Sequence, residues 1–194
     1  MLTSHSIGTE RKASIVDEFK RSIHSKNMII RFTDKLLKKL KLGNISRVEK
    51  YPGPFLEWYA HLFSVQRTQY ILVTEAASLY TVVMYGRGVV DSNIFLQQFF
   101  SFLREHMEEI EGRLIYERII APNSDRITLS KTINKSVLGS INDMVNMSKF
   151  IVERDDMSPF DLSDFMNNTP FKFINYQSPL AAFKSMKLKK GTDV

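Results

Sequence analysis

The sequence contains no cysteine, so disulfides, thiol nucleophiles and cysteine-ligated metal sites are excluded. No apolar run approaches the roughly 18 residues that a membrane-spanning helix needs, and the first residues lack the apolar core of a signal peptide. Histidine is scarce, and its residues show no metal-ligand spacing: His5, His24, His61 and His106. These absences predict a cytoplasmic protein that does not bind a membrane, a metal ion or another cofactor.

Complete catalytic motifs are missing as well. The segment GRGVVDSN at 86–93 lacks the Gly-Lys-Ser/Thr of a phosphate loop and the three-glycine spacing of a dinucleotide fingerprint. Ser136 and Ser140 have no adjacent base, and the GxSxG pattern of a nucleophile elbow is absent. We therefore name no catalytic residue, and the sequence favours a protein that is not an enzyme.

The chain does have an ordinary globular composition with an uneven charge. Hydrophobic residues make up 43% and charged residues 25% of its 194 residues, which suits one folded domain with a substantial core. The net charge is +6, and most of the excess falls in residues 28–54. A positive charge of this kind attracts anionic partners without specifying which one.

The pattern of the residues divides the chain into an extension, a domain and a tail. Residues 1–27 form an N-terminal extension, in which apolar residues recur at helical spacing from Arg11 to His24 and predict a helix. Residues 28–186 contain all the other patterned segments and are predicted to form a single α+β domain. Residues 187–194 form a basic tail.

Hydrophobic periodicity predicts the elements of the domain. Strands are expected at 28–32, 58–65, 70–74, 79–85, 114–120 and 126–130, the last of them at an edge. Helices are expected at 34–42, at 91–110 with Asp91 as its cap, from Ser136 onward, and after Ser158 and Ser178, each of which precedes a proline. The run at 79–85 is almost continuously apolar, as in a central strand that is covered on both faces.

These elements indicate an α+β fold. We expect a mostly antiparallel sheet of about five strands, with the three strands between 58 and 85 forming a meander. Two long helices are expected to pack on the sheet, and short C-terminal helices to cover the sheet or its edge.

Three sequence blocks carry a family resemblance: IIRFTDKLLKKLKL at 29–42, SLYTVVMYGRGVVDSN at 78–93 and SKTINKSVLGSINDM at 130–144. Through these blocks, residues 28–186 resemble a bacterial family described as a domain of unknown function. Members of this family often begin at the position of Met28. The resemblance implies a shared fold and a cytoplasmic, bacterial or mobile-element setting. It implies no activity, so no catalytic residue is carried over from it.

Arginines on turns and strands are the main candidates for binding an anion. Arg87 lies between two glycines where a strand meets a helix amino terminus, a place that favours anions, although the glycines alone explain the turn. Arg118 alternates with apolar residues in a predicted strand, so it needs either a partner or an opening to solvent. Its role is then either a structural ion pair or a contact to a substrate. Arg126 follows the turn at Pro122. If the last two elements pack as a hairpin beside the first, some of these arginines converge near one end of the sheet, where they can bind a carboxylate or phosphate. The structural alternative is that each arginine pairs separately with a carboxylate.

Polar residues around the predicted helix at 136 are further candidates for ligand contacts, namely Ser136 and Asn142. The simpler interpretation is structural, with Ser136 capping the helix and Gly139 permitting close packing. For the histidines we likewise expect structural roles. His61 is interpreted as a hydrogen-bonded residue of a strand, and His106 as a surface residue of a helix.

A basic helix face is the remaining candidate. In the helix at 34–42, Lys35, Lys38 and Lys39 share the face opposite a leucine stripe. Such a face is either a solvated surface or a surface that binds phosphates of nucleic acid.

Three functions remain open. The preferred one is a non-catalytic binding or regulatory module, antitoxin-like or associated with a mobile element, that recognises a protein or an anionic ligand. The alternatives are a nucleic-acid-binding accessory protein that uses the lysines of the basic helix, and an enzyme that holds an anionic substrate with Arg87, Arg118 and Arg126. The sequence does not define the oligomeric state.

Overall fold

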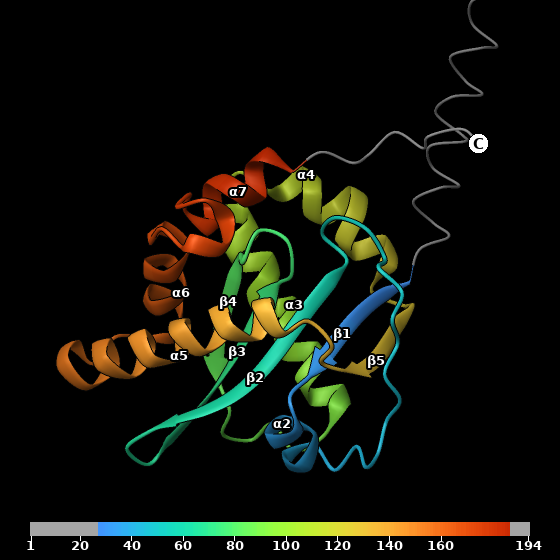
Figure 1. Ribbon diagram of the computed structural model, residues 1–194, viewed down its shortest axis with the longest axis horizontal. Helices are drawn as coiled ribbons and strands as arrows, with labels where there is room; N and C mark the ends of the chain where they lie inside the picture. Colours follow the sequence, from blue (N-terminus) through green and yellow to red (C-terminus); the bar gives the residue numbers. More distant parts are fainter. Residues whose placement is uncertain (1–26, 187–194) are drawn as a thin grey trace, which may run out of the picture.

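The computed structural model describes residues 27–186, so the predicted helix at 11–24 and the basic tail lie outside the described residues. A five-stranded sheet forms the centre of the fold (Figure 1), with the strand order β4-β3-β2-β1-β5. The strands are β1 (Met28–Phe32), β2 (Glu57–Val65), β3 (Thr68–Glu75), β4 (Thr81–Tyr85) and β5 (Ile127–Lys131). The helices are α2 (Asp34–Lys39), α3 (Ser92–Glu109), α4 (Arg113–Ile115), α5 (Lys135–Asp155), α6 (Pro159–Asn168) and α7 (Pro179–Ser185).

The sheet is mixed, and its antiparallel pairings form the larger part of the ladder. β2, β3 and β4 form the predicted antiparallel meander, and β1 lies between β2 and β5 with parallel pairing on both sides. The predicted α+β class, the five strands and the edge position of β5 are thus confirmed.

β4 is an edge strand, so the predicted central position of the run at 79–85 is wrong. Both faces of the strand are nevertheless covered, as its apolar run predicts, because Val82 and Met84 are buried on one face and Val83 on the other. In addition, α6 covers the open edge of the strand. The Ser163 hydroxyl accepts a hydrogen bond from the Val83 N–H at 2.8 Å, and the Asn167 amide both accepts from the N–H and donates to the carbonyl of Thr81, each at 2.8 Å. These side chains satisfy backbone groups that an edge strand otherwise leaves unpaired.

The two long helices lie on opposite faces of the sheet, with α5 in front and α3 behind it in Figure 1. On the α3 face, aromatic rings pack edge to face, Phe32 against Phe95 at 5.1 Å and Trp58 against Phe99 at 5.2 Å. On the α5 face, apolar residues of β3 and β4 share a buried cluster with Met144 and other residues of α5. Both faces are therefore covered by apolar side chains, which supplies the main stabilisation of the fold.

The predicted strand at 114–120 is wrong, because this segment is helical. α4 continues into a π-helical turn, η1 (Tyr116–Ile120), and a 3₁₀ turn, η2 (Ala121–Asn123). Ile115 and Ile119 both contact the core at helical spacing, and Leu114 is 59% exposed. In a segment this short, the apolar residues fit both the two-residue period of a strand and the 3.6-residue period of a helix. The pattern alone therefore does not distinguish a strand from a helix.

The predicted helix starts are mostly confirmed. Asp91 accepts hydrogen bonds from the backbone N–H groups of α3, and Ser158 and Ser178 cap α6 and α7. The cap of α5 is Asn134 and not Ser136, since the Asn134 side chain accepts from the N–H of Ser136 at 2.9 Å. A second short 3₁₀ turn, η3 (Lys172–Ile174), lies between α6 and α7.

Candidate functional site

Strand direction brings several chain segments together at one end of the sheet. β1, β2, β4 and β5 run in the same direction, because β1 pairs in parallel with β2 and β5 and because β2 and β4 are both antiparallel to β3. Their carboxyl ends meet in the lower part of Figure 1, where α2 also lies. In open sheets with parallel strands, ligands commonly bind outside this end.

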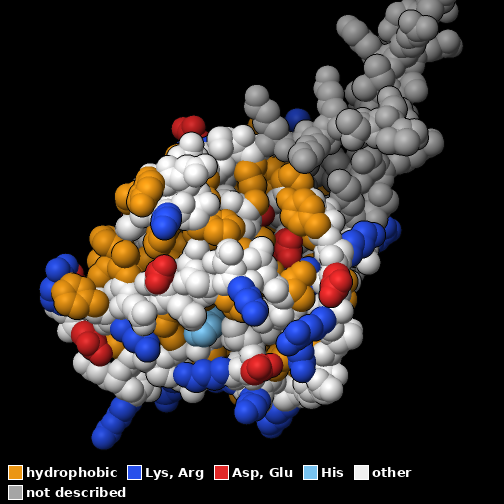
Figure 2. Space-filling view, viewed as in Figure 1, with side chains coloured by type: hydrophobic (Ala, Val, Ile, Leu, Met, Phe, Trp, Pro, Cys, Tyr) orange, Lys and Arg blue, Asp and Glu red, His pale blue; other side chains and the backbone are white. Residues whose placement is uncertain are grey.

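A lysine or arginine lies at the carboxyl end of each of these strands or in the segment that follows it. α2 follows β1 and carries lysines, the turn after β2 contains Arg67, the turn after β4 contains Arg87, and β5 ends at Lys131. Figure 2 shows Lys and Arg side chains gathered on the lower part of the molecule. We call this region the basic end of the sheet.

The glycines on either side of Arg87 fix the turn that presents it. A Cβ at Gly86 would lie 3.0 Å from the Cβ of Gln69, and the Gly86 N–H donates to the Gln69 carbonyl at 2.7 Å. Gly88 has a φ of +81°, which side-chain-bearing residues rarely adopt. The turn therefore follows the neighbouring strand closely, and Arg87 lies exposed beside the β2–β3 hairpin.

A groove of about 820 Å³ opens at this point, and we call it the cationic groove. Its lining comes from α2, the hairpin and the turn after β4: Lys39, Arg67, Thr68, Gln69, Tyr85, Arg87 and Gly88. The Lys39 ammonium donates to the Gln69 amide oxygen at 2.7 Å, a neutral partner that leaves its charge uncompensated. The sequence-predicted residues Lys39 and Arg87 thus lie together with Arg67, which the sequence analysis missed.

Carboxylates do not neutralise the cationic groove within residues 27–186. Ion pairs in this part of the chain include Arg31–Glu57, Arg104–Glu108, Arg113–Glu117 and Arg154–Asp155. None of them involves a cation of the groove. Among the described residues, no carboxylate therefore pairs with Lys39, Arg67 or Arg87.

Two smaller hollows lie at the same end of the sheet. One, of about 580 Å³, has Lys38, Lys41 and Lys131 in its lining, together with Asp34, and we call it the lysine hollow. The other, of about 370 Å³, is the glutamine hollow, and its lining combines residues of β4, the following turn and α3: Tyr85, Arg87, Ile94, Gln97, Gln98, Ser101 and Phe102. Tyr85 and Arg87 are shared between the glutamine hollow and the cationic groove.

His61 is a half-buried residue of β2 whose chemistry is affected by neighbouring cations. Burial lowers the pKa of His61 below its ordinary value, and Lys35 and Lys149 lower it further. Its Nδ1 atom is buried and has no hydrogen-bond partner among the described residues. The predicted hydrogen-bonded role is therefore not observed for this nitrogen.

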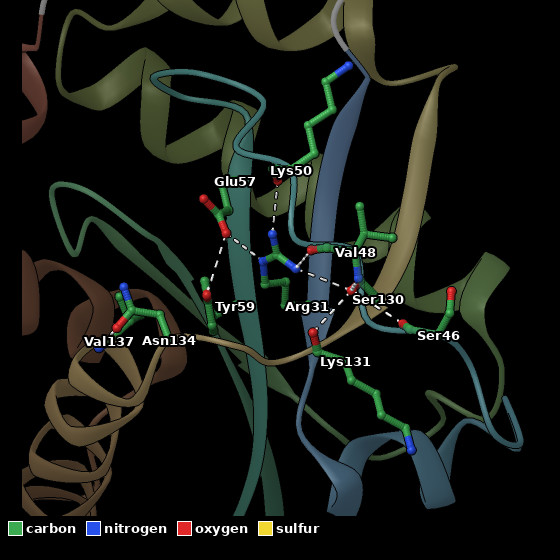
Figure 3. A network of polar contacts seen from close by, with 10 residues as sticks. All are labelled: Arg31, Ser46, Val48, Lys50, Glu57, Tyr59, Ser130, Lys131, Asn134 and Val137. Carbon is green, nitrogen blue, oxygen red and sulfur yellow. Dashed lines mark hydrogen bonds and ion pairs between the residues drawn. The ribbon is translucent and has the colours of Figure 1, made fainter.

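A second polar cluster, which the sequence analysis also missed, surrounds Arg31 (Figure 3). Arg31 is fully buried on β1, and its guanidinium donates to the Glu57 carboxylate at 2.5 Å and to the carbonyls of Val48 and Lys50 at 2.6 and 3.2 Å. It also donates to the Ser130 hydroxyl at 3.2 Å. An arginine within the otherwise apolar strand MIIRF was the sequence signal, since such a charge requires a partner.

This Arg31 network attaches the connection between α2 and β2 to the sheet. The Ser130 hydroxyl accepts from the Val48 N–H at 2.9 Å, and Tyr59 completes the network from β2 with its ring 5.9 Å from the guanidinium carbon of Arg31. Desolvation raises the pKa of Tyr59, and the nearby Glu57 raises it further. Protein groups satisfy this cluster, so its role is structural.

The opposite end of the sheet also carries a buried carboxylate. Glu75 is fully buried at the end of β3, and its Oε2 atom accepts from the N–H and hydroxyl of Ser78 at 2.7 and 2.6 Å and from the N–H of Ala77 at 3.0 Å. Burial raises the pKa of Glu75 in spite of these bonds. Desolvation likewise raises the pKa of Tyr51 to about 12, with further contributions from Glu75 and Glu57. The hydrogen bonds that Glu75 accepts hold the turn between β3 and β4.

The predicted arginine cluster does not form. Arg87 follows β4, whereas Arg126 precedes β5, so the two lie at opposite edges and opposite ends of the sheet. Arg118 is exposed on the π-helical turn η1 and not on a strand. A shared clamp of Arg87, Arg118 and Arg126 is therefore excluded by the topology.

The candidates of the polar segment lie on α5, outside the linings of the hollows at the basic end. Ser136 and Asn142 are exposed on this helix. An added Cβ at Gly139 would contact nothing within 4 Å, so the predicted close packing at this glycine is wrong. The predicted surface role of His106 is also wrong, because this residue is 3% exposed and its ring stacks on Phe160 at 4.1 Å.

The described part of the chain offers neither a metal site nor a membrane span. Within residues 27–186, no cluster of three His, Asp or Glu side chains could hold a metal ion. No helix in the same range is both long enough and apolar enough to cross a membrane.

The comparisons with known proteins agree with the three sequence blocks. A family model described as a domain of unknown function, DUF6933, matches residues 29–182. The predicted family resemblance is confirmed by this match. No curated protein and no solved structure matches the chain.

Proposed function

The chain belongs to the DUF6933 family, and we propose that it is a non-catalytic binding module that recognises an anionic, phosphate-bearing ligand in the cationic groove at the basic end of the sheet. The description of the family assigns no activity, so the proposal rests on the geometry of the groove.

The observation that carries the proposal is the convergence of Lys39, Arg67 and Arg87. They come from three separate segments, line one groove and have no carboxylate partner among residues 27–186. Grouping like charges costs stability through mutual repulsion. A bound polyanion reverses this repulsion, and arginine in particular matches the oxygens of a phosphate with parallel N–H donors.

The same lining favours binding over catalysis. It contains lysine, arginine, threonine, glutamine, tyrosine and glycine side chains, and none of these types ordinarily titrates near neutral pH. General acid–base catalysis is most efficient with a group whose pKa lies near the working pH. The alternative of an enzyme that acts on an anionic substrate depended on a clamp of Arg87, Arg118 and Arg126, and the topology of the sheet excludes this clamp.

The setting implied by the family resemblance fits this proposal. A cytoplasmic bacterial protein meets nucleotides and nucleic acids as its most common phosphate-bearing partners. A regulatory role, antitoxin-like or linked to a mobile element, would use the same groove to sense or hold such a partner.

A thermal-shift titration with sodium tripolyphosphate at low salt tests the proposal. At a ligand concentration of about one hundred times Kd, the melting temperature of the wild-type protein should rise by about 5 °C or more. The variant Arg67→Gln/Arg87→Gln should lose this shift. The matched control Arg104→Gln/Arg113→Gln removes two exposed arginines elsewhere and should keep it. An equal shift in all three proteins, or none in the wild type, would contradict the proposal.

A further inference from the structure

The geometry points to a single-stranded nucleic acid as the ligand, and this inference rests on the proposed function. We propose that a strand runs from the lysine hollow past α2, through the cationic groove and into the glutamine hollow. Its phosphates would contact the cations, and at least one base would enter the glutamine hollow.

The arrangement of the three hollows is the first argument. The cationic groove and the glutamine hollow share Tyr85 and Arg87. On the other side, consecutive residues of α2 line different hollows, with Lys38 in the lysine hollow and Lys39 in the cationic groove. A compact anion would need only one of these hollows, whereas an extended polyanion uses all three.

The change of chemistry along this path is the second argument. The lysine hollow and the cationic groove supply positive charge, as a phosphate backbone requires. The glutamine hollow instead supplies the amides of Gln97 and Gln98 and the hydroxyl of Ser101, which contain both donors and acceptors. Base edges need both kinds of group, whereas an acidic peptide presents mainly acceptors.

Aromatic residues at the same place support base contacts. Tyr85 lines both the cationic groove and the glutamine hollow and is 48% exposed, and Phe102 lines the glutamine hollow. The ring of Tyr85 packs against that of Tyr70 at 5.5 Å, which limits its freedom. An exposed, partly fixed aromatic ring next to a positively charged groove is the usual arrangement for stacking unpaired bases.

The shape of the basic end favours a single strand over a duplex. A duplex is typically read by a helix or a two-stranded ribbon in its major groove. α2, which carries Lys38 and Lys39, has six residues and spans about 9 Å, which is too short to follow a major groove. The cations instead line hollows on both sides of α2. In a duplex the bases are stacked and cannot reach the glutamine hollow.

Fluorescence anisotropy with labelled oligonucleotides tests the inference. The probes are single strands of dT and of U, each about 4 and about 12 nucleotides long, and a duplex of about 12 base pairs. The 12-mers should bind at least about tenfold more tightly than the 4-mers and the duplex. With about four phosphates contacted, the logarithm of the affinity should fall against the logarithm of salt concentration with a slope of about −3.

Variants of the glutamine hollow separate base contacts from charge. Tyr85→Ala and Gln97→Ala should each weaken 12-mer binding by about threefold or more, whereas Tyr85→Phe should bind like the wild type. Gln97 does not line the cationic groove, so Gln97→Ala should also leave the tripolyphosphate shift unchanged. Gln97 is an exposed helix residue, so its variant remains informative if Tyr85→Ala is unstable.

The outcomes distinguish this inference from the proposed function. If tripolyphosphate binds but the 12-mer binds no more tightly than the 4-mer or the duplex, the single-strand inference is wrong and the anion site stands. If Tyr85→Ala and Gln97→Ala both bind the 12-mer like the wild type, base recognition in the glutamine hollow is wrong. If neither tripolyphosphate nor any oligonucleotide binds, both proposals fail.

Discussion

Arg31 and Arg87 belong to the same sheet, but their surroundings differ in nearly every respect. Arg31 is fully buried and donates hydrogen bonds to a carboxylate, two backbone carbonyls and a hydroxyl. Arg87 is exposed, and no ion pair of the described residues includes it. The fold uses the donors of Arg31 to hold a connection in place, whereas those of Arg87 remain available to a ligand.

The comparison extends from these two residues to the regions around them. Around Arg31, the protein itself satisfies the guanidinium, and removing one member leaves another polar group buried without a partner. In the cationic groove, the positive charges come from separate segments and repel one another. Substitutions should therefore affect stability in the first region and ligand affinity in the second.

The largest expected effect is on the Arg31 network. Arg31→Met should lower the free energy of unfolding by about 3–5 kcal/mol, because the Glu57 carboxylate is left buried and uncompensated. Urea denaturation followed by circular dichroism measures this change. The matched variant Arg87→Met should change the free energy of unfolding by less than about 0.5 kcal/mol. Equal effects of the two substitutions would remove the distinction between the regions.

The second prediction extends the comparison to a buried group that titrates. Burial lowers the pKa of His106 to about 4, while Asp164 opposes this shift. As the pH falls below the ordinary histidine pKa of about 6.5, His106 of the unfolded chain binds a proton that the folded protein excludes. The contribution of His106 to the free energy of unfolding is therefore fully present above this pH and is lost as the pH approaches 4. The loss should be about 3 kcal/mol.

Urea denaturation between pH 7 and pH 4 checks the effect of His106. His106→Phe keeps an aromatic ring against Phe160 and should show a smaller loss of stability over this range than the wild type. The difference between the two proteins isolates His106 from other titrating groups. Identical pH profiles would show that His106 has the same pKa in the folded protein as in the unfolded chain and would contradict the prediction.

A smaller effect is expected at the start of α5, where two neighbouring polar residues differ as Arg31 and Arg87 do. The Asn134 side chain accepts hydrogen bonds from the N–H groups of Ser136 and Val137, so Asn134→Ala should cost about 1 kcal/mol. The exposed Ser136 side chain has no capping role, and Ser136→Ala should cost less than about 0.5 kcal/mol. Thermal unfolding of both variants measures the difference, and a larger loss for Ser136→Ala would contradict the observed cap.

Much of the fold was predictable from the sequence because local signals coincide with the elements. The leucine stripe of α2, the cap at Asp91 and the Ser-Pro pairs before α6 and α7 each have a local cause. The segment 114–120 was not predictable in this way, since its apolar residues satisfy both a strand and a helix period. The position of β4 at an edge also has no local signal, because the side chains that cover its edge come from α6.

The site was predictable only in part. The predicted meander already implies that Arg67 and Arg87 are neighbours, because the end of β4 pairs with the start of β3. The proximity of Lys39 depends on the parallel pairing of β1 with β2, which joins segments that no turn connects. Strand order of this kind is set by packing of the whole sheet, so no local pattern encodes it.

The most direct test of the central claim measures stability and affinity on one variant, Lys39→Gln/Arg67→Gln/Arg87→Gln. If the charges of the cationic groove serve a ligand and not the fold, urea denaturation should give a free energy of unfolding equal to that of the wild type or slightly higher, because repulsion is removed. Calorimetric titration with tripolyphosphate should show at least about a tenfold loss of affinity, or about 1.4 kcal/mol. A variant that is clearly destabilised but binds tripolyphosphate like the wild type would contradict the claim.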